Sequence, residues 1–280
     1  MALVNTALPL AQAYTAQDCK FLFCQNQPTM KHITILTGAS RGMGLALAQQ
    51  LCATGAVLLC ISRATSQLLE DQALAQGANL TQWSADLADA APVAARLQAW
   101  LSGQNPAGVA SATLINNAGM VGRLGPLDSL DAHNIATTLR VDLEAPMQLC
   151  GAFLDATRTW AMPRKILNIS SGLGRRPMAG AALYCAANAG MDHFSRCVAL
   201  DEALHTQGVR IVSLAPGVID TDMQGDLRAG DPGNFPDRAG FVRMKDTGAL
   251  TSPSDAARRV LAYLARKDFG DQPVADVRDA

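Results

Sequence analysis

The chain has 280 residues, of which 49% are apolar and 17% charged, and its formal net charge is −1 at pH 7. This balance is typical of a globular protein and is poor in charge, so it disfavours a disordered chain and a basic nucleic-acid-binding surface. A single α/β domain of this length buries a large core between a sheet and two layers of helices. We therefore expect one folded domain and no nucleic-acid partner.

The seven cysteines, at positions 19, 24, 52, 60, 150, 185 and 197, are odd in number and form no CxxC pair. This pattern argues against a disulfide framework and a structural zinc site, and it fits a reducing cytoplasm. The four histidines show no metal-ligand spacing, so we predict no metal. No apolar run approaches the ~18 residues that cross a bilayer, which predicts a cytoplasmic protein without a membrane partner.

Residues 1–31 differ from the rest of the chain, because they mix Ala, Gln, Asn and Thr with Leu and show no clear period. A signal peptide is disfavoured, since the first basic residue is Lys20 and Pro9 interrupts the apolar stretch. We expect a poorly ordered N-terminal extension. The alternative is that this segment lies upstream of a start at Met30, because the first predicted strand follows directly.

From His32 onward, short β-rich runs alternate with longer helical stretches, which is typical of βαβ units in a parallel sheet. The predicted strands cover residues 32–37, 56–61, 79–84, 112–116, 165–170, 209–214 and 272–277. The predicted helical stretches cover residues 43–53, 65–76, 88–102, 128–158 with breaks, 181–206 and 253–266. The fold class is therefore a Rossmann-like, doubly wound α/β fold with seven parallel strands and helices on both faces, in one domain over residues 32–280. The Gly- and Pro-rich stretch 224–240 is expected to form a mobile substrate lid.

A glycine-rich turn follows the first predicted strand and opens a helix, with the sequence TGASRGMG over residues 37–44. Glycines at such a turn let the backbone approach a pyrophosphate at the helix N-terminus. The alternative, a tight connection without a ligand, is less favoured for a turn on the first strand. The residues expected to hold the cofactor here are Gly38, Ser40, Arg41, Gly42, Met43 and Gly44.

The second predicted strand ends in Ile61-Ser62-Arg63 and offers no carboxylate to bond the adenosine ribose. A hydroxyl and a cation at this place suit a 2′-phosphate, and Arg41 is a second guanidinium for it. The alternative is a pair of surface arginines near helix ends. We therefore predict NADP(H) as the cofactor, with Ser62 and Arg63 contacting it.

Five motifs occur in order along the chain, each at the carboxyl end of a predicted strand. They are the glycine-rich turn, Asp86-Leu87, Asn116-Asn117-Ala118-Gly119, Ser171 thirteen residues before Tyr184, and Pro216-Gly217 with Thr221. Together they resemble the short-chain dehydrogenase/reductase family over nearly all of residues 32–280. The resemblance implies further cofactor contacts from Asp86, Leu87, Asn117, Ala118, Gly119, Tyr184, Asn188, Pro216, Gly217, Ile219, Thr221 and Met223.

Segments outside these motifs resemble the sepiapterin reductases of that family, notably ALYCA at 182–186 and DTDMQ at 220–224. The chain's ADVRD at 275–279 is similar to a V-D-x-x-D ending whose first aspartate anchors the substrate. The resemblance thus implies a substrate contact by Asp276, and the alternative is a solvated carboxylate near the chain end. It also implies a homodimer through the two long helices, 128–158 and 181–206.

Reduction of a carbonyl needs an acid for the developing alkoxide and a donor for the carbonyl oxygen. We expect Tyr184 and Ser171 to supply these groups and to contact the substrate; the alternative is a core tyrosine bonded by a serine. Two positions depart from the family. Its Y-x-x-x-K lysine is Asn188 here, and its active-site asparagine aligns with Asp142, so the four catalytic candidates are Ser171, Tyr184, Asn188 and Asp142.

The missing lysine matters because an adjacent cation lowers a tyrosine pKa toward neutrality. A pKa lower by about two corresponds to about 2.7 kcal/mol, on the order of a hundredfold in rate. An ionised Asp142 would raise that pKa, while Arg175 and Arg176 are candidate replacement cations. The first interpretation is an NADPH-dependent reductase of a small ketone or vicinal dicarbonyl. The alternatives are a catalytically impaired NADP(H)-binding sensor or scaffold, and a lysine-to-asparagine change in an otherwise active enzyme.

Overall fold

The computed structural model describes residues 30–279, so the extension predicted over residues 1–31 lies almost entirely outside the described residues. Within residues 30–279, seven strands form one parallel sheet in the order β3-β2-β1-β4-β5-β6-β7. The strands are β1 Lys31–Thr37, β2 Ala56–Ser62, β3 Asn79–Ser84, β4 Val109–Asn116, β5 Arg164–Ile169, β6 Arg210–Ala215 and β7 Val274–Asp276. This sheet confirms the predicted fold class.

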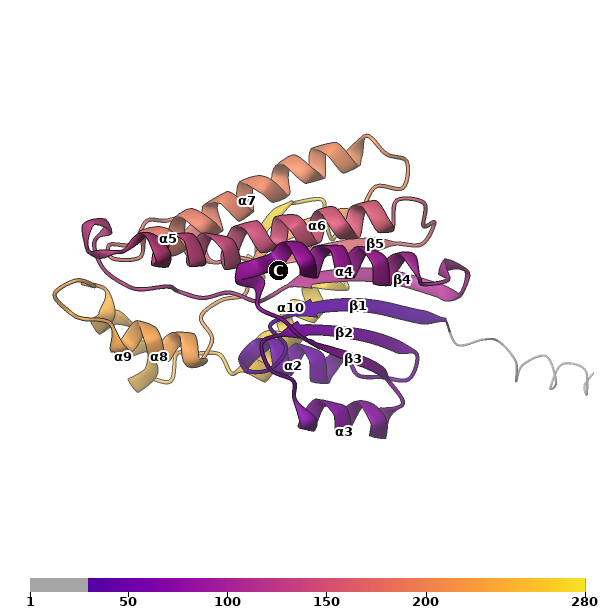
Figure 1. Ribbon diagram of the computed structural model, residues 1–280. Helices are drawn as coiled ribbons and strands as arrows, with labels where there is room; N and C mark the ends of the chain where they lie inside the picture. The colour runs from indigo at the N-terminus through magenta and orange to yellow at the C-terminus, as the bar shows by residue number, and fades with distance from the viewer. Residues whose placement is uncertain (1–29, 280) are drawn as a thin grey trace, which may run out of the picture.

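Helices cover both faces of the sheet, and a separate apolar core fills the space on each face (Figure 1). One layer consists of α2 (Gly42–Leu51), α3 (Gln67–Gln76) and α10 (Pro253–Leu264). The other consists of α4 (Ala90–Ser102), α6 (Ala145–Ala156) and α7 (Ala182–Ala203). The central strands are nearly continuous apolar runs because both of their faces are buried. In this described range no helix is long and apolar enough to cross a membrane.

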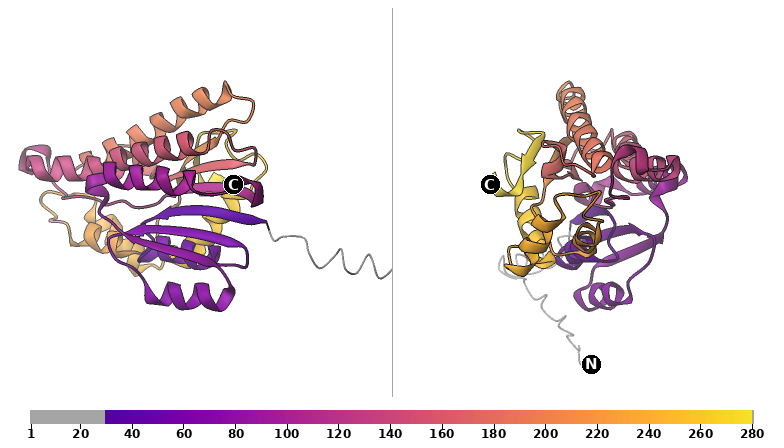
Figure 2. Two further views of the ribbon diagram at one scale, coloured as in Figure 1. Left: turned by 45° about the vertical axis from the view of Figure 1, so that its right-hand side comes forward. Right: turned by 90° about the vertical axis from the view of Figure 1, so that its left-hand side faces the viewer.

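Three shorter helices, α5 (Ala132–Leu139), α8 (Asp222–Ala229) and α9 (Arg238–Asp246), lie beyond the carboxyl ends of the strands (Figure 1). In the end-on view, α8 and α9 stand in front of this edge of the sheet (Figure 2, right). Ligands of doubly wound folds bind at the carboxyl edge, where the loops after successive strands converge. The candidate site therefore lies between the strand ends and α8.

The helix predicted over residues 128–158 is divided in the structure. A π-helical turn, Arg140–Glu144, separates α5 from α6, and Pro146 lies in the first turn of α6. Proline has no N–H to donate to the carbonyl four residues earlier, so the regular helix is interrupted here. The π-turn matters for function because it carries Asp142.

Two further boundaries differ from the prediction. The last strand is shorter than residues 272–277, because its ladder with β6 covers only Val274–Asp276. The segment 224–240, predicted as a mobile substrate lid, contains most of α8 and the beginning of α9. The rings of Phe235 and Phe241 in this region stack with their centroids 5.7 Å apart, and both are buried. These rings hold the segment in place, which its content of glycine and proline did not indicate.

Candidate active site

The glycine-rich turn between β1 and α2 brings two stretches of backbone into direct contact. Gly38 and Gly42 have φ angles of +71° and +55°, values that favour glycine. A Cβ at Gly44 would overlap the carbonyl oxygen of Gly38 and lie 2.5 Å from the Asn117 side-chain amide. The turn, which also carries Ser40 and the buried Met43, thus has the bare backbone that a pyrophosphate needs at a helix N-terminus.

We expect Gly44→Ala to lower stability by about 1–3 kcal/mol, the usual cost of overpacking, and to weaken NADPH binding strongly. The physical reason is that the added methyl group must displace the turn's own backbone. Thermal unfolding and a fluorescence titration with NADPH measure the two effects. Gly240→Ala in α9 is the matched control, because its Cβ would meet nothing within 4 Å. Unchanged NADPH affinity in Gly44→Ala would contradict the assignment of this turn.

The segment after β4 holds the turn in shape. The Asn117 side-chain amide donates to the carbonyls of Thr37 (3.0 Å) and Gly38 (3.3 Å). The buried Thr37 hydroxyl accepts from the backbone N–H groups of Asn117 and Ala118, both at 2.9 Å. Asn117 thus supports the turn, and its neighbours Ala118 and Gly119 continue the same edge. Thr37 is a supporting residue that the sequence analysis missed, although its place at the end of β1 was the available signal.

The predicted 2′-phosphate contacts lie near the ends of β2 and β3. Ser62 is buried, and its hydroxyl has no hydrogen-bond partner within the described residues, so it is available to a ligand. Arg63 is exposed, and Ser84 donates to its carbonyl oxygen at 3.0 Å. Asp86 caps the short turn after β3 through the Ala88 N–H at 2.9 Å, while its neighbour, the predicted contact Leu87, is buried in the core.

The other predicted guanidinium, Arg41, pairs with Asp222 at 3.0 Å, and both side chains are largely exposed. An exposed ion pair is worth little, about 0–1 kcal/mol, so a phosphate could displace Asp222. The same pair brings the N-terminus of α8 against the glycine-rich turn, where a Cβ at Gly42 would lie 3.3 Å from the Thr221 methyl group. Pro216, Gly217 and Ile219 form the connection from β6 to this helix.

Tyr184 lies in the first turn of α7, and Ser171 is the second residue after β5. Burial first, and then the charge of Asp142, raise the pKa of Tyr184 to about 12, while the polar side chains of Ser171 and Asn188 nearby oppose this rise. The Tyr184 hydroxyl also lies 3.9 Å from the Met223 sulfur of α8. The structure therefore brings together the predicted serine and tyrosine, in a site that disfavours the phenolate.

Asn188 does not replace the lysine of the family motif in its interaction with the tyrosine hydroxyl. Its buried side-chain amide donates to the carbonyl oxygen of Tyr184 at 2.8 Å, one turn back along α7. The amide is thus engaged with the helix backbone, and it carries no charge to stabilise a phenolate. The position still adjoins the tyrosine, as the one-turn spacing predicts.

Asp142 is held in the π-helical turn by one bond, from the Met120 N–H to its Oδ1 atom at 2.9 Å. Its other oxygen is buried and has no partner within residues 30–279. Burial raises the pKa of Asp142 to about 7, and the Met120 bond only partly opposes this. The carboxyl group is therefore neutral over much of the acidic range and becomes charged near physiological pH.

The raised pKa of Asp142 predicts an unusual pH dependence of stability. Because the folded pKa of Asp142 lies above its unfolded value of 3.8, the folded state holds the proton more tightly. Protonated Asp142 therefore contributes its full share of the free energy of unfolding below about pH 4. This contribution, as much as about 4 kcal/mol, is lost as the pH rises to about 7. We expect Asp142→Asn to gain stability relative to the wild type across this window. Denaturant unfolding at several pH values tests this, with the exposed Asp201→Asn as control.

The two candidate replacement cations follow Ser171 in the loop. Arg175 donates to Asp192 at 2.9 Å and to the carbonyl oxygen of Ala275 at 2.9 Å, so its guanidinium is already engaged. Arg176 is exposed and forms no ion pair in the part of the chain that the structure describes. Neither arrangement supplies the charge that the missing lysine would have placed beside Tyr184.

Asp276 ends β7 opposite Ala215 and is buried. Both of its oxygens accept hydrogen bonds from the Arg278 guanidinium, at 2.8 and 2.5 Å, and these bonds hold its pKa below the usual range. The carboxylate thus lies at the carboxyl edge of the sheet, as a substrate anchor must. A substrate would have to share it with, or displace, the largely exposed Arg278.

An apolar cluster surrounds Tyr184 on the side of α8 and α9. Its buried members are Val121, Ala181, Leu227, Phe235 and Phe241, and the partly buried ones are Leu124, Met178, Tyr184, Cys185, Met223 and Met244. The cluster joins the loops after β4 and β5 to the segment that was predicted as a lid. The Tyr184 hydroxyl therefore adjoins side chains that suit an apolar or aromatic ligand.

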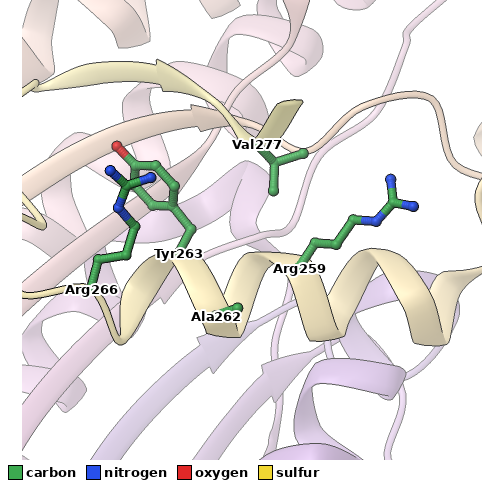
Figure 3. Close-up of a pocket in the computed structure, with 5 residues that line it drawn as sticks. All are labelled: Arg259, Ala262, Tyr263, Arg266 and Val277. Carbon is green, nitrogen blue, oxygen red and sulfur yellow. The ribbon is translucent and has the colours of Figure 1, made fainter. Parts of the chain in front are cut away.

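A groove elsewhere on the surface is lined by one side of α10 together with Val277, as Figure 3 shows. Its Arg266 lies over the Tyr263 ring at 5.1 Å and pairs with Asp268 at 2.7 Å. None of the predicted catalytic or cofactor residues lines this groove. We therefore place the candidate site at the carboxyl edge of the sheet.

The doubly wound parallel sheet, with a glycine-rich turn and a serine–tyrosine pair at its carboxyl edge, defines the class of nicotinamide-dependent oxidoreductases. The chain belongs to the short chain dehydrogenase family, whose model matches residues 32–232. Members of this family act on CH–OH and C=O groups, and both this membership and the likeness to sepiapterin reductases agree with the sequence analysis.

Three comparisons show the degree of similarity. The chain is 34% identical over 235 residues to a benzil reductase ((S)-benzoin forming) of Bacillus cereus, which covers 84% of this chain and 94% of that protein. It is 33% identical over 258 residues to the sepiapterin reductase of Meriones unguiculatus, with 88% and 96% covered. Its fold matches the crystal structure of the KRED1-Pglu enzyme with a TM-score of 0.73 at 26% identity, over 86% and 99% of the two chains.

Proposed function

We propose that the protein is an NADPH-dependent reductase of small ketones or vicinal dicarbonyls, with apolar or aromatic diketones as the favoured substrates. The observation that carries the proposal is the Tyr184 hydroxyl, which adjoins Ser171 and lies within an apolar cluster at the carboxyl edge of the sheet. The similarity to a benzil reductase supports the substrate class, since benzil is an aromatic vicinal diketone.

The residues present fit a bound dinucleotide, because the Gly38–Gly44 contact leaves bare backbone and the buried Ser62 hydroxyl lacks a partner within the described residues. The glycine-rich turn would hold the pyrophosphate, and Ser62, Arg63 and Arg41 would hold a 2′-phosphate. When bound, NADPH supplies the hydride that reduces the carbonyl carbon. The preference for NADPH rests on the two guanidiniums and on the lack of a carboxylate at the end of β2.

In the proposed reaction, Ser171 donates a hydrogen bond to the substrate's carbonyl oxygen, and Tyr184 transfers its phenolic proton to that oxygen. Within residues 30–279 no cation contributes to the pKa of Tyr184, which burial raises to about 12, so the remaining phenolate depends on hydrogen bonds. A protonated Asp142 removes a repelling charge from the phenolate. Asp276 would contact a polar group of the substrate at the end of β7.

The test is oxidation of NADPH by the purified full chain with benzil, an aliphatic diketone and sepiapterin, followed by the loss of NADPH absorbance. NADPH and NADH binding are measured separately by nicotinamide fluorescence. We expect turnover of at least one diketone and tighter binding of NADPH than of NADH. Tight NADPH binding without turnover of any carbonyl would overturn the reductase and favour a cofactor-binding sensor or scaffold. Absence of binding would overturn both.

We also propose a homodimer that forms through α7 and its neighbour α6. Two large apolar side chains at the C-terminal end of α7 are exposed: Leu200 by 71%, and Leu204, the residue that follows the helix, by 85%. Exposed leucines one turn apart are typical of a helix face that another chain covers. We expect Leu200→Glu with Leu204→Glu to shift the protein to a monomer in size-exclusion chromatography with light scattering. Leu74→Glu on α3, which is 84% exposed, should leave the mass unchanged.

A further inference from the structure

We propose that Asp192 is a positioning residue that, together with Arg175, aligns Ser171 and the end of β7 for the reaction. This inference rests on the proposed function, because it assigns a role in the reduction to groups that touch neither substrate nor cofactor. It joins three parts of the site that are distant in sequence: the loop after β5, the helix that carries Tyr184, and the last strand.

The Asp192 carboxylate is the centre of a buried network. It lies on α7 eight residues after Tyr184 and is only 2% exposed. Its Oδ1 atom accepts from the hydroxyls of Ser170 at 2.8 Å and Ser213 at 2.7 Å, and its Oδ2 atom accepts from the Arg175 Nε–H at 2.9 Å. One side chain thus connects α7 to β6 and to two loop residues, Ser170 and Arg175, that lie on either side of Ser171.

Arg175 extends the connection to the last strand. Its Nη2 atom donates to the Ala275 carbonyl oxygen at 2.9 Å, and Ala275 directly precedes the predicted substrate contact Asp276. Within the loop, a Cβ at Gly174 would lie 2.9 Å from the backbone carbon of Asn188, so the loop packs directly on α7. Movement of the Asp192–Arg175 pair would therefore shift Ser171 relative to Tyr184, and Asp276 relative to both.

Stability alone does not require a charge at this place, because a buried ion pair contributes little beyond what apolar packing would supply. What a carboxylate supplies is an acceptor for three donors at once, with fixed directions. An asparagine has the same shape, but it can accept from the Arg175 N–H only if its amide nitrogen faces the two hydroxyls, which must then accept where they donated before. Asp192→Asn therefore disrupts the alignment while it conserves the volume.

The same helix offers a matched control. Glu202 is 4% exposed and pairs with Arg158 through two hydrogen bonds, at 2.8 and 3.0 Å, near the C-terminal end of α7. It also accepts from the Val209 N–H at 2.8 Å, at the far end of the helix from Tyr184. Glu202→Gln removes a comparable buried charge without touching the loop after β5.

The experiment compares wild type, Asp192→Asn, Arg175→Ala and Glu202→Gln in NADPH binding, diketone turnover and thermal unfolding. We expect Asp192→Asn and Arg175→Ala to lower kcat at least about tenfold, since small misalignments of reacting groups are costly. NADPH Kd should change by less than about twofold. In the double variant, the losses should not multiply, because both substitutions break one connection. Added guanidinium should restore part of the activity of Arg175→Ala, whose side chain is partly exposed.

Two results would overturn the inference. The first is that Asp192→Asn keeps the wild-type kcat. The second is that Glu202→Gln and Asp192→Asn lower the melting temperature equally and also lower kcat equally. If the wild type itself reduces no carbonyl, the proposed function fails, and hydrogen exchange of residues 170–176 then decides the inference. Faster exchange in Asp192→Asn, but not in Glu202→Gln, would support it, and equal exchange would overturn it.

Discussion

Tyr184→Phe is expected to lower kcat for carbonyl reduction by roughly 10³-fold and to leave NADPH binding nearly unchanged. General acids typically contribute 10²–10⁴-fold to the rate. The ring remains in the apolar cluster after the substitution, so packing is conserved. Steady-state kinetics with the best diketone, together with fluorescence titration of NADPH, measure the two quantities.

Tyr263→Phe is the matched control for this experiment. Tyr263 is also a buried tyrosine with a raised pKa, but it lies on α10 and contacts Phe269, away from the loop after β5. We expect this variant to keep wild-type kcat. If Tyr184→Phe retained more than about a tenth of the wild-type kcat, the assignment of Tyr184 as the proton donor would be wrong.

Asn188→Lys is expected to raise kcat by up to about a hundredfold. An ammonium group beside Tyr184 favours the phenolate and lowers the pKa of Tyr184 from about 12. A decrease of about two in this pKa corresponds to about 2.7 kcal/mol. The decrease in the pKa of Tyr184 should also be visible in the pH dependence of kcat. Reduction needs the protonated tyrosine, so a lower pKa moves the alkaline fall in kcat to lower pH.

The control for charge is Asn188→Met, which has a similar reach without a cation and should bring no gain in kcat. Asp142→Asn combined with Asn188→Lys restores both residues of the family pattern, and it removes the carboxylate with which a new lysine would pair. We expect the double variant to be at least as active as Asn188→Lys alone. An Asn188→Lys variant with tight NADPH binding and no gain in kcat would show that the missing charge does not limit this protein.

The sequence by itself determined the number of strands, their parallel direction and the edge of the sheet where the site was expected, because these follow from local patterns. The period of apolar residues defines each βαβ unit, and the glycines of the first turn show where the backbone must approach a phosphate. Ser171 and Tyr184 were found from the resemblance to the family, whose motif places a serine after the fifth predicted strand and a tyrosine thirteen residues later. The changed residues Asn188 and Asp142 were visible for the same reason.

Only the tertiary structure decided which charges are free to act. Arg175 is held by Asp192 and Ala275, Arg41 by Asp222, and Asp276 by Arg278. The first two of these pairings join segments that are distant along the chain, so no local pattern predicts them. The same holds for the pKa values of Asp142 and Tyr184, because burial sets both, and burial depends on how the loops and α8 pack over the edge of the sheet.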